Sequence, residues 1–255
     1  MKIAIVGAGA VGTNLAHVLY AEGINIVQII SRNSEHGKKV AQQCGAKYSP
    51  HPFGLENSVT HVLLTVPDQF IYEVASNLPK GNYCLIHTSG STPMESIKDQ
   101  AEEVGVFYPL QSFSVEQQAD WQEIPIFVEA NSKVLEDQLF NLARKIATTV
   151  NVLDSERRSL LHLSAVFACN FSNYLITIAQ DLVKSAGQSE SILTPLINET
   201  SSRAVDFGAK LSQTGPAKRG DLDTIKKHLD LLSFREDDYA VYKLLSDMLM
   251  RRYKS

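Results

Sequence analysis

The amino-acid sequence predicts an α/β domain with a mainly parallel sheet, followed by an all-helical domain. In the first half of the chain, short apolar runs rich in strand-forming residues alternate with segments whose apolar residues recur at helical spacing. Strands that alternate with helices are typical of a parallel sheet covered on both faces. After Val150–Leu153 the strand pattern stops and helical patterns continue. We therefore expect two domains, at residues 1–153 and 154–255.

The strands of the first domain are expected at six short apolar runs: Ile3–Val6, Ile26–Ile30, His61–Val66, Cys84–His87, Val104–Tyr108 and Val150–Leu153. Amphipathic patterns between them predict helices at Val11–Ala21, Glu35–Cys44 and Gln69–Leu78. The second domain begins at Asp154-Ser155, which can cap a long helix that runs to Ala186 before the stop at Gly187. Further helical patterns lie at Ser191–Phe207, Asp221–Leu232 and Glu236–Arg252.

The composition narrows the classes of function. Lys and Arg number 24 against 28 Asp and Glu, a net charge of −4, so we expect no nucleic-acid partner. The cysteines Cys44, Cys84 and Cys169 lie far apart without metal-ligand spacing, so we expect buried free thiols and no metal site. Cysteines that are expected to stay unpaired fit a reduced, cytoplasmic setting. The N-terminus shows no signal-peptide pattern.

One stretch, from Ser159 to Gln180, contains no Asp, Glu, Lys or Arg and is long enough to span a bilayer. Polar residues are spread through it, at His162, Ser164, Asn170, Ser172, Asn173 and Thr177. This is too polar for a single lipid-facing helix, whereas a helix that is apolar on most of its surface is commonly buried inside a protein. We therefore expect no membrane span, and interpret the stretch as the central helix of the second domain.

The segment Gly7-Ala8-Gly9-Ala10-Val11-Gly12 has the G-x-G-x-x-G pattern of a dinucleotide-binding turn. The pattern alone is weak, but here an expected strand precedes it and an expected helix follows. Gly7 allows a tight turn, Gly9 lets the backbone approach a pyrophosphate, and Gly12 lets the helix pack against the strand. The helix N-terminus adds N–H groups and partial positive charge for the phosphates. A plain glycine-rich turn is the alternative.

The end of the second strand selects the nucleotide. NAD sites usually place an Asp or Glu about 20 residues after the motif, and the run Ile30-Ser31-Arg32-Asn33 contains none. Ser31 and Asn33 can hydrogen-bond a 2′-phosphate, while Arg32 can pair with it and stack on adenine. We therefore expect NADP in preference to NAD; the alternative is a solvated basic turn.

Polar residues follow the fourth, fifth and sixth strands, at the edge of the sheet where ligands bind. The fourth strand ends in Val66-Pro67-Asp68, a loop expected along the nicotinamide-side ribose, although Asp68 is equally suited to cap a helix. The fifth ends at His87 and Ser89, and the sixth at Tyr108–Gln111. His87 and Tyr108 are candidate acids for a nicotinamide enzyme. Alternatively, His87 hydrogen-bonds a backbone group and holds its loop.

The glycine motif, the Val66-Pro67-Asp68 turn and the helical second half resemble the superfamily of 6-phosphogluconate dehydrogenase-like, pyrroline-5-carboxylate reductase-like and ketopantoate reductase-like enzymes. Three further runs resemble a bacterial family of NADP oxidoreductases: His87-Thr88-Ser89-Gly90, Tyr108–Phe113 and Gly215–Asp221. The resemblance covers nearly the whole chain. It implies a Rossmann-like N-terminal domain, a C-terminal helical domain of the DUF2520 type and NADP as cofactor, and it leaves the substrate open.

One departure from this superfamily bears on the reaction. Its hydroxyacid dehydrogenases and ketopantoate reductases carry a catalytic Lys four residues before an Asn on the first long helix of the second domain. Here Val166 stands four residues before Asn170. This favours an imine reductase, because an iminium carbon accepts hydride without further protonation. Arg219 is the candidate for binding a substrate carboxylate, unless it only precedes a helix that Asp221 caps.

The polar residues His162, Asn170 and Asn173 of the uncharged helix are spaced i, i+8 and i+11. We expect them on one face of the helix, directed into the cleft between the domains. The remaining apolar surface of this helix exceeds what the short helices of one subunit would cover. Related members of the superfamily pair their helical domains, so we expect a homodimer built on this helix.

Together these observations predict an NADP-dependent oxidoreductase that acts on a small imine or carbonyl substrate in the interdomain cleft. The expected catalytic residues are His87, Ser89 and Asn170, and the expected substrate-binding residues are Tyr108, Gln111, His162, Asn173 and Arg219. One alternative is a non-catalytic NADP-binding sensor or regulator, which the missing Lys favours. Another is a prephenate dehydrogenase-like enzyme, although Tyr108 stands where that family has a His before the proline.

Overall fold

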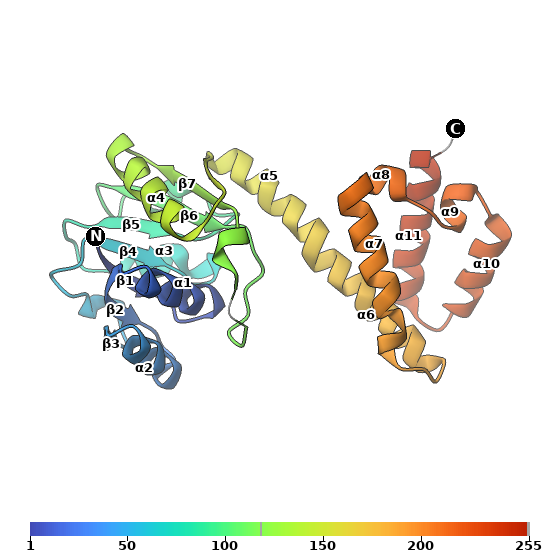
Figure 1. Cartoon of the computed structure of the whole chain (residues 1–255), viewed down its shortest axis with the longest axis horizontal. Helices are drawn as coiled ribbons and strands as arrows, with labels where there is room; N and C mark the ends of the chain where they lie inside the picture. The colour runs from blue at the N-terminus through green and yellow to red at the C-terminus, as the bar shows by residue number, and fades with distance from the viewer. Residues whose placement is uncertain (118, 254–255) are drawn as a thin grey trace. The chain divides into compact units, whose positions relative to one another are not determined.

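The computed structural model describes residues 1–117 and 119–253, and the chain divides into two compact units, Met1–Asn170 and Phe171–Ser255. The first unit is built on one sheet and the second consists of helices, as Figure 1 shows. This arrangement confirms the α/β fold followed by a helical region that the sequence predicts.

The sheet of the first unit has eight strands in the order β3-β2-β1-β4-β5-β6-β7-β8. They are β1 (Lys2–Val6), β2 (Asn25–Ile30), β3 (Lys47–Ser49), β4 (His61–Leu64), β5 (Cys84–His87), β6 (Val104–Pro109), β7 (Ile126–Ala130) and β8 (Val150–Val152). Neighbouring strands are parallel except β6 and β7. The six predicted strands are confirmed, while β3 and β7 were not expected. The chain runs outward from β1 to β3 and returns beside β1 at β4, which creates a switch point where ligands bind in such sheets.

Helices cover both faces of this sheet (Figure 1). One face carries α1 (Ala10–Ala21), α2 (Ser34–Gln43) and α4 (Lys133–Ile146), and the other carries α3 (Ile71–Ser76). Successive residues of β1 therefore enter different apolar layers: Ile3 and Ile5 pack with α1, and Ala4 and Val6 pack on the α3 side. Single 3-10 turns lie at Pro52–Gly54, Asp68–Phe70, Met94–Ile97 and Trp121–Glu123.

The second unit is helical, as expected. Its helices are α6 (Ser172–Ser185), α7 (Thr194–Phe207), α8 (Ala209–Ser212), α9 (Pro216–Arg219), α10 (Leu222–Leu231) and α11 (Glu236–Tyr253), with a 3-10 turn at Glu190–Leu193. A π turn, Val166–Phe171, joins α6 to α5 (Ser155–Ala165) in one continuous helix, Ser155–Ser185. By length and composition alone this helix could cross a membrane, a criterion that core helices of soluble proteins also meet. However, none of its most apolar 18-residue window is buried within the described chain, so the burial expected for this helix is not observed there.

The structure places the division between the units at Asn170, further along the chain than the expected boundary at residue 153. β8 does end at Val152, but α5 belongs to the first unit. The reason is that Arg158 of α5 is buried and ion-paired with Glu129 of β7. The start of the long helix is thus anchored on the sheet.

The three cysteines are free thiols. Cys44 is buried and Cys84 half-buried, where burial and the Glu103 carboxylate raise the Cys84 pKa to about 11. Cys169 is exposed, so the expected burial is wrong for this residue. Within residues 1–117 and 119–253, no three His, Cys, Asp or Glu side chains gather as metal ligands.

Candidate active site

The glycine loop between β1 and α1 leaves room for a ligand at one position and none at the other two. Gly7 has φ +109°, and a Cβ there would lie 2.8 Å from the Thr65 carbonyl oxygen. A Cβ on Gly12 would lie 1.9 Å from the Gly7 carbonyl oxygen. By contrast, a Cβ on Gly9 would meet no described atom within 4 Å. Gly7 and Gly12 are therefore needed by the fold, whereas Gly9 keeps open space in front of the helix.

The N-terminus of α1 faces this open space. Its N-cap residue is Gly9, and no described side chain caps it. Unpaired N–H groups and the helix dipole make such a terminus a site for phosphate. Thr65, at the end of β4, fixes the loop because its hydroxyl lies 2.6 Å from the Gly7 carbonyl oxygen and donates to it. This role of Thr65 could not be predicted from the sequence, because a lone Thr after an apolar strand carries no signal of such a contact.

The segment after β2 lies beside the segment after β4. The Arg32 side chain is exposed, and its guanidinium carbon lies 5.4 Å from the centre of the Phe70 ring. Asn33 caps α2, since its side-chain oxygen accepts from the His36 N–H at 3.1 Å. The Ser31 carbonyl accepts from the Tyr48 hydroxyl at 2.9 Å. The two segments thus flank the glycine loop, with Arg32 available for an anionic group.

The loops after β4 and β5 are joined by a hydrogen bond from the Ser91 hydroxyl to the Asp68 carboxylate at 2.5 Å. Asp68 lies in a 3-10 turn whose N-cap residue is Pro67. Ser89 shapes the β5 loop, because its hydroxyl oxygen accepts the N–H groups of Ser91 and Thr92 at 3.2 and 2.9 Å. It also donates to the Thr92 hydroxyl at 2.9 Å. The contacts of Ser89 are thus those of a turn-forming side chain.

His87 is fully buried beneath this turn. Its Nδ1 accepts the Ser89 N–H at 3.2 Å, while its Nε2 has no hydrogen-bond partner of good geometry among the described residues. Burial and the nearby Arg158 charge lower the pKa of His87 to about 3, against smaller opposing effects of Asp68 and the Pro93 carbonyl. The imidazole is therefore neutral at physiological pH. This geometry favours the loop-holding alternative over proton donation.

Replacing His87 tests its buried, neutral state. The pKa of His87 is about 3 in the folded protein and an ordinary 6.5 in the unfolded chain. Below pH 6.5 the unfolded chain binds a proton at this residue and the folded protein does not. The stability that the neutral imidazole contributes is therefore complete above pH 6.5 and is lost as the pH falls toward 3. Relative to His87→Gln, we expect wild-type protein to lose about 2 kcal/mol of unfolding free energy between pH 7.5 and pH 5. Urea denaturation at both pH values measures this difference. His51→Gln, the same change at an exposed position, should show no such loss, and parallel curves for His87→Gln and wild type would contradict the assignment.

Tyr108 and His162 form a polar pair at the carboxyl end of β6. The Tyr108 hydroxyl oxygen lies 3.2 Å from His162 Nδ1, and the two rings meet edge to face. Gly90 packs against both, since a Cβ there would lie 2.7 Å from His162 Nδ1 and 2.7 Å from Tyr108 Cζ. Burial and the Asp68 carboxylate raise the pKa of Tyr108, and the Arg158 charge opposes them. The pair is thus a protonated phenol with a histidine partner, both within the first unit.

Asn170, Asn173 and Gln111 lie outside this cluster of contacts. Asn170 belongs to the exposed π turn, and Asn173 is an exposed residue of the second unit. A π turn hydrogen-bonds i to i+5 and breaks the repeat of about 3.6 residues. The single face expected for His162, Asn170 and Asn173 assumes an unbroken α-helical repeat, and it stays a prediction. Gln111 is exposed, and its side-chain oxygen accepts the neighbouring Ser112 N–H at 2.8 Å.

Arg219 ends the short helix α9 of the second unit and is exposed. Asp221 caps α10 by accepting the Thr224 N–H at 3.0 Å, and this bond is the first cause of its lowered pKa. The expected cap is confirmed. The role of Arg219 toward a substrate stays a prediction.

Two known families match the two parts of the chain. Residues 2–89 match the family described as NADP oxidoreductase, coenzyme F420-dependent. Residues 124–249 match a domain of unknown function, DUF2520.

Solved structures and curated proteins add three likenesses. The putative NADP oxidoreductase BF3122 from Bacteroides fragilis is 33% identical, with a TM-score of 0.90 over 98% of each chain. An imine reductase from Streptomyces aurantiacus has a TM-score of 0.70 over 98% of this chain and 94% of that chain, but its 16% identity shows the fold alone. The glutamyl-tRNA reductase of Sulfurisphaera tokodaii is 38% identical over 79 residues, which are 31% of this chain and only 18% of that protein.

Proposed function

This chain belongs to a family of NADP oxidoreductases that combine a nucleotide-binding domain with DUF2520, and on that premise we propose that it transfers hydride between NADP and a small imine or carbonyl compound. The observation that carries the proposal is the Tyr108–His162 pair, a proton-holding group at the carboxyl end of the sheet. NADPH, when bound, supplies the hydride. The fold shared with an imine reductase supports the substrate class.

The residues of the first unit fit a dinucleotide. The backbone of Gly7 to Gly12 would hold the pyrophosphate, because Gly9 is open and the α1 N-terminus lacks a side-chain cap. Ser31, Arg32 and Asn33 would hold the 2′-phosphate, and Val66, Pro67 and Asp68 would follow the nicotinamide-side ribose. Arg32 supplies the positive charge that selects NADP.

Arg32→Ala tests the selection of NADP. We expect the variant to bind NADPH at least about tenfold more weakly, since a charge-assisted hydrogen bond is worth about 1.5–3 kcal/mol. Binding of NADH should change little, because NADH has no 2′-phosphate. Fluorescence titration of both nucleotides measures the ratio. Lys80→Ala removes a cation that precedes β5, at the amino end of the strands, and should change neither; equal loss of both affinities in Arg32→Ala would contradict the assignment.

Tyr108 is the proposed proton donor. With His162 Nδ1 donating to the Tyr108 oxygen, the phenol proton is available for the carbonyl oxygen or imine nitrogen of the substrate. The resulting phenolate then accepts the His162 hydrogen bond and is stabilised by it. This donor serves in place of the catalytic Lys, whose position on the long helix is occupied by Val166. His87 and Ser89 would hold the β5 loop, while the roles of Gln111, Asn170, Asn173 and Arg219 and a substrate site in the interdomain cleft stay predictions.

A non-catalytic NADP-binding sensor is the competing function. The absence of Lys from Ser159 to Gln180 favours it, whereas the Tyr108–His162 pair favours an enzyme. Oxidation of NADPH in the presence of imines, 2-oxo acids and aldehydes separates the two. A sensor would bind NADPH tightly and oxidise it with none of them.

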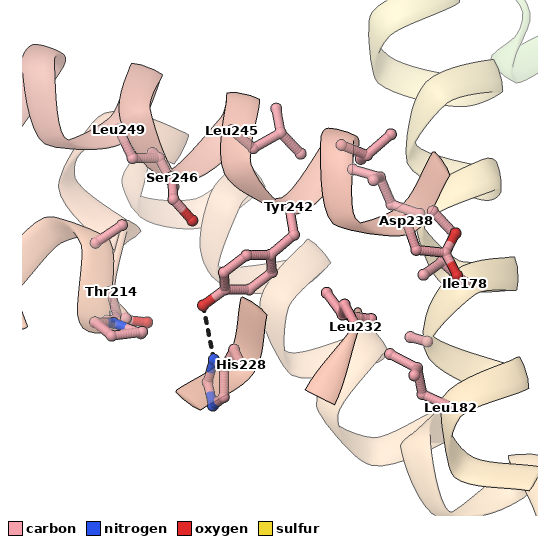
Figure 2. Close-up of a pocket in the computed structure, with 16 residues that line it drawn as sticks. Ile178, Leu182, Thr214, His228, Leu232, Asp238, Tyr242, Leu245, Ser246 and Leu249 are labelled. Atoms are coloured by element: carbon pink, nitrogen blue, oxygen red, sulfur yellow. Dashed lines mark hydrogen bonds between the residues drawn. The ribbon is translucent and has the colours of Figure 1, made fainter. Parts of the chain in front are cut away.

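We also propose that the protein is a homodimer through its helical region. Of the described residues 171–253, only Ala217, Ile225, Leu232 and Ser246 are buried, which is far too few for a self-sufficient domain of this size. This unit contains a cavity of about 370 Å³. Figure 2 shows apolar side chains of α6 and α11, such as Ile178, Leu182 and Leu245, among the residues that line it. Large apolar side chains are exposed along the long helix and beyond, including Leu160, Leu163, Tyr174, Leu196 and Leu211. A second copy of the chain would cover such a surface.

Sedimentation velocity at micromolar concentration tests the homodimer. We expect wild-type protein to sediment as a dimer. Leu163→Glu places a charge on the exposed face of α5, where Leu163 is 51% exposed, and should shift the protein toward monomer. Phe53→Glu changes a side chain that is 70% exposed in the first unit and should leave the dimer intact. A stable wild-type monomer would exclude this proposal.

A cytoplasmic location stays a prediction as well. The fold is that of NADP oxidoreductases, and the first turns of α5 carry Arg157 and the buried Arg158. Both observations support the proposal that the long apolar helix contacts a second subunit and does not span a membrane. Fractionation of cells expressing the protein would test this, with recovery in the membrane pellet as the contrary result.

A further inference from the structure

Arg158 of α5 is a buried arginine with a dense set of contacts. Its side chain is only 1% exposed and forms an ion pair with Glu129 of β7. Its Nη2 donates to the Thr92 carbonyl at 2.6 Å and to the Ser155 hydroxyl at 3.2 Å. One guanidinium therefore joins the first turn of α5, the strand β7 and the loop after β5. We call these groups the Arg158 clamp.

Ser155 and Glu129 complete the clamp. The Glu129 carboxylate accepts the Ser155 N–H at 3.1 Å and its hydroxyl at 2.8 Å. The Ser155 oxygen in turn accepts the Met94 N–H at 3.0 Å. Backbone groups on both sides of Pro93 are thus held by the start of α5. Only Arg158 Nε, among the buried side-chain atoms of the clamp in the described residues, has no hydrogen-bond partner. A buried network with so many contacts holds its members in one arrangement.

The segments that the clamp joins carry the groups of the proposed reaction. His162 lies four residues after Arg158, on the same side of α5. Gly90 lies two residues before Thr92 and packs against the rings of His162 and Tyr108. A displacement of the helix start or of the β5 loop would therefore separate the pair.

We propose that Arg158 is a positioning residue for catalysis, which holds α5 and the β5 loop so that His162 and Gly90 meet the Tyr108 hydroxyl. This inference rests on the proposed role of Tyr108. The buried Arg158–Glu129 ion pair would then serve to position the catalytic groups, since the net effect of such a pair on stability is commonly small.

The charge of Arg158 has a second effect on Tyr108. Arg158 lowers the pKa of Tyr108, whereas burial and Asp68 raise it. The other titratable groups around this site are Glu129, which pairs with Arg158, His162 and the buried His87. Removal of the cation should therefore raise the pKa of Tyr108 and move the alkaline limit of activity to higher pH, while Lys at this position should leave the limit in place.

The experiment compares Arg158→Lys, Arg158→Met and the control Arg157→Met. Arg157 is the adjacent arginine, but it is exposed and, within the described part of the chain, pairs with the exposed Asp154. For Arg158→Lys we expect kcat to fall about 10²-fold, as for a displacement of about 1 Å at a reacting group. The NADPH dissociation constant should change less than about twofold, because the glycine loop is untouched. Arg158→Met should in addition move the alkaline limit of activity to higher pH. Arg157→Met should change neither kcat nor this limit.

Two readouts do not depend on activity. Exchange of the Met94 amide hydrogen should accelerate at least about tenfold in Arg158→Lys, since an opened clamp exposes it. Ultraviolet difference titration against Tyr108→Phe gives the pKa of Tyr108 directly. If Tyr108→Phe is fully active, the proposed role of Tyr108 as proton donor fails, while these two readouts still decide whether the clamp acts on Tyr108. If Arg158→Lys does not fold, Ser155→Ala, which keeps the Arg158–Glu129 ion pair but removes the Met94 contact, takes its place in the exchange measurement. A lowered melting temperature with unchanged kcat, exchange and Tyr108 pKa would overturn the proposal.

Discussion

Tyr108→Phe is expected to lower kcat by about 10²–10⁴-fold, the usual contribution of a general acid, while NADPH binds as tightly as before. The phenol is the group that can give a proton to the reduced substrate, and it is held by His162 at 3.2 Å. Its pKa is raised above the ordinary 10.0, so the proton is present throughout the neutral range. Activity should decline only as the pH rises through that raised pKa. Steady-state kinetics across pH and fluorescence titration of NADPH measure the two quantities.

Tyr83→Phe is the matched control for this substitution. Tyr83 is also buried, but its hydroxyl donates to the Pro79 carbonyl at 2.8 Å, at the beginning of β5. The same loss of a buried hydroxyl should leave kcat near the wild-type value there. Full activity of Tyr108→Phe on an imine would show that proton transfer does not depend on Tyr108. A comparable loss in both variants would point to damaged packing.

Gly12→Ala is expected to abolish NADPH binding and to destabilise the fold by about 3 kcal/mol or more, at the upper end for overpacking. A Cβ at this position would lie 1.9 Å from the Gly7 carbonyl oxygen and 2.5 Å from the Thr65 hydroxyl. The first contact is with backbone, so it cannot be relieved by turning a side chain. Thermal unfolding and NADPH titration measure the two effects.

Gly9→Ala separates cofactor contact from folding. Gly9 has φ −77° and ψ −167°, an extended conformation that alanine adopts without strain. Its Cβ would enter open space, so the melting temperature should stay near that of wild type. NADPH should nevertheless bind more weakly, because the added methyl group lies where the pyrophosphate approaches the backbone. Unchanged NADPH affinity in Gly9→Ala would contradict the placement of the cofactor on this loop.

Local sequence patterns were enough to predict the glycine turn and the elements around it. The turn from Gly7 to Gly12 and the helix after it are encoded by neighbouring residues, and the strand ends follow from the parallel order. The strand β7 was missed, although its Ile126 and Val128 are buried. Its antiparallel pairing with β6 breaks the strand–helix alternation on which the prediction rested. The helix α4 after it was missed for the same reason.

The contacts that hold the residues of the candidate site could not be predicted, because they depend on where α5 meets the sheet. Arg157 and Arg158 look alike in the sequence, yet one is exposed and the other is a largely hidden partner of Glu129. His87 and Ser89 have the chemistry of catalytic groups, but burial and the turn they hold decide their contacts. The periodicity that grouped His162 with Asn173 gave no sign of the π turn that lies between them.

Hydride transfer from NADPH labelled with deuterium at C4 tests the central claim most directly. The purified protein is mixed with the labelled cofactor and, in separate reactions, with cyclic imines, 2-oxo acids and aldehydes. We predict that at least one imine or carbonyl compound gains deuterium at its former double-bonded carbon, in step with loss of NADPH absorbance. We also predict that Tyr108→Phe transfers far less in the same time. Tight binding of NADPH without deuterium transfer to any compound of these classes would contradict the account and favour a sensor.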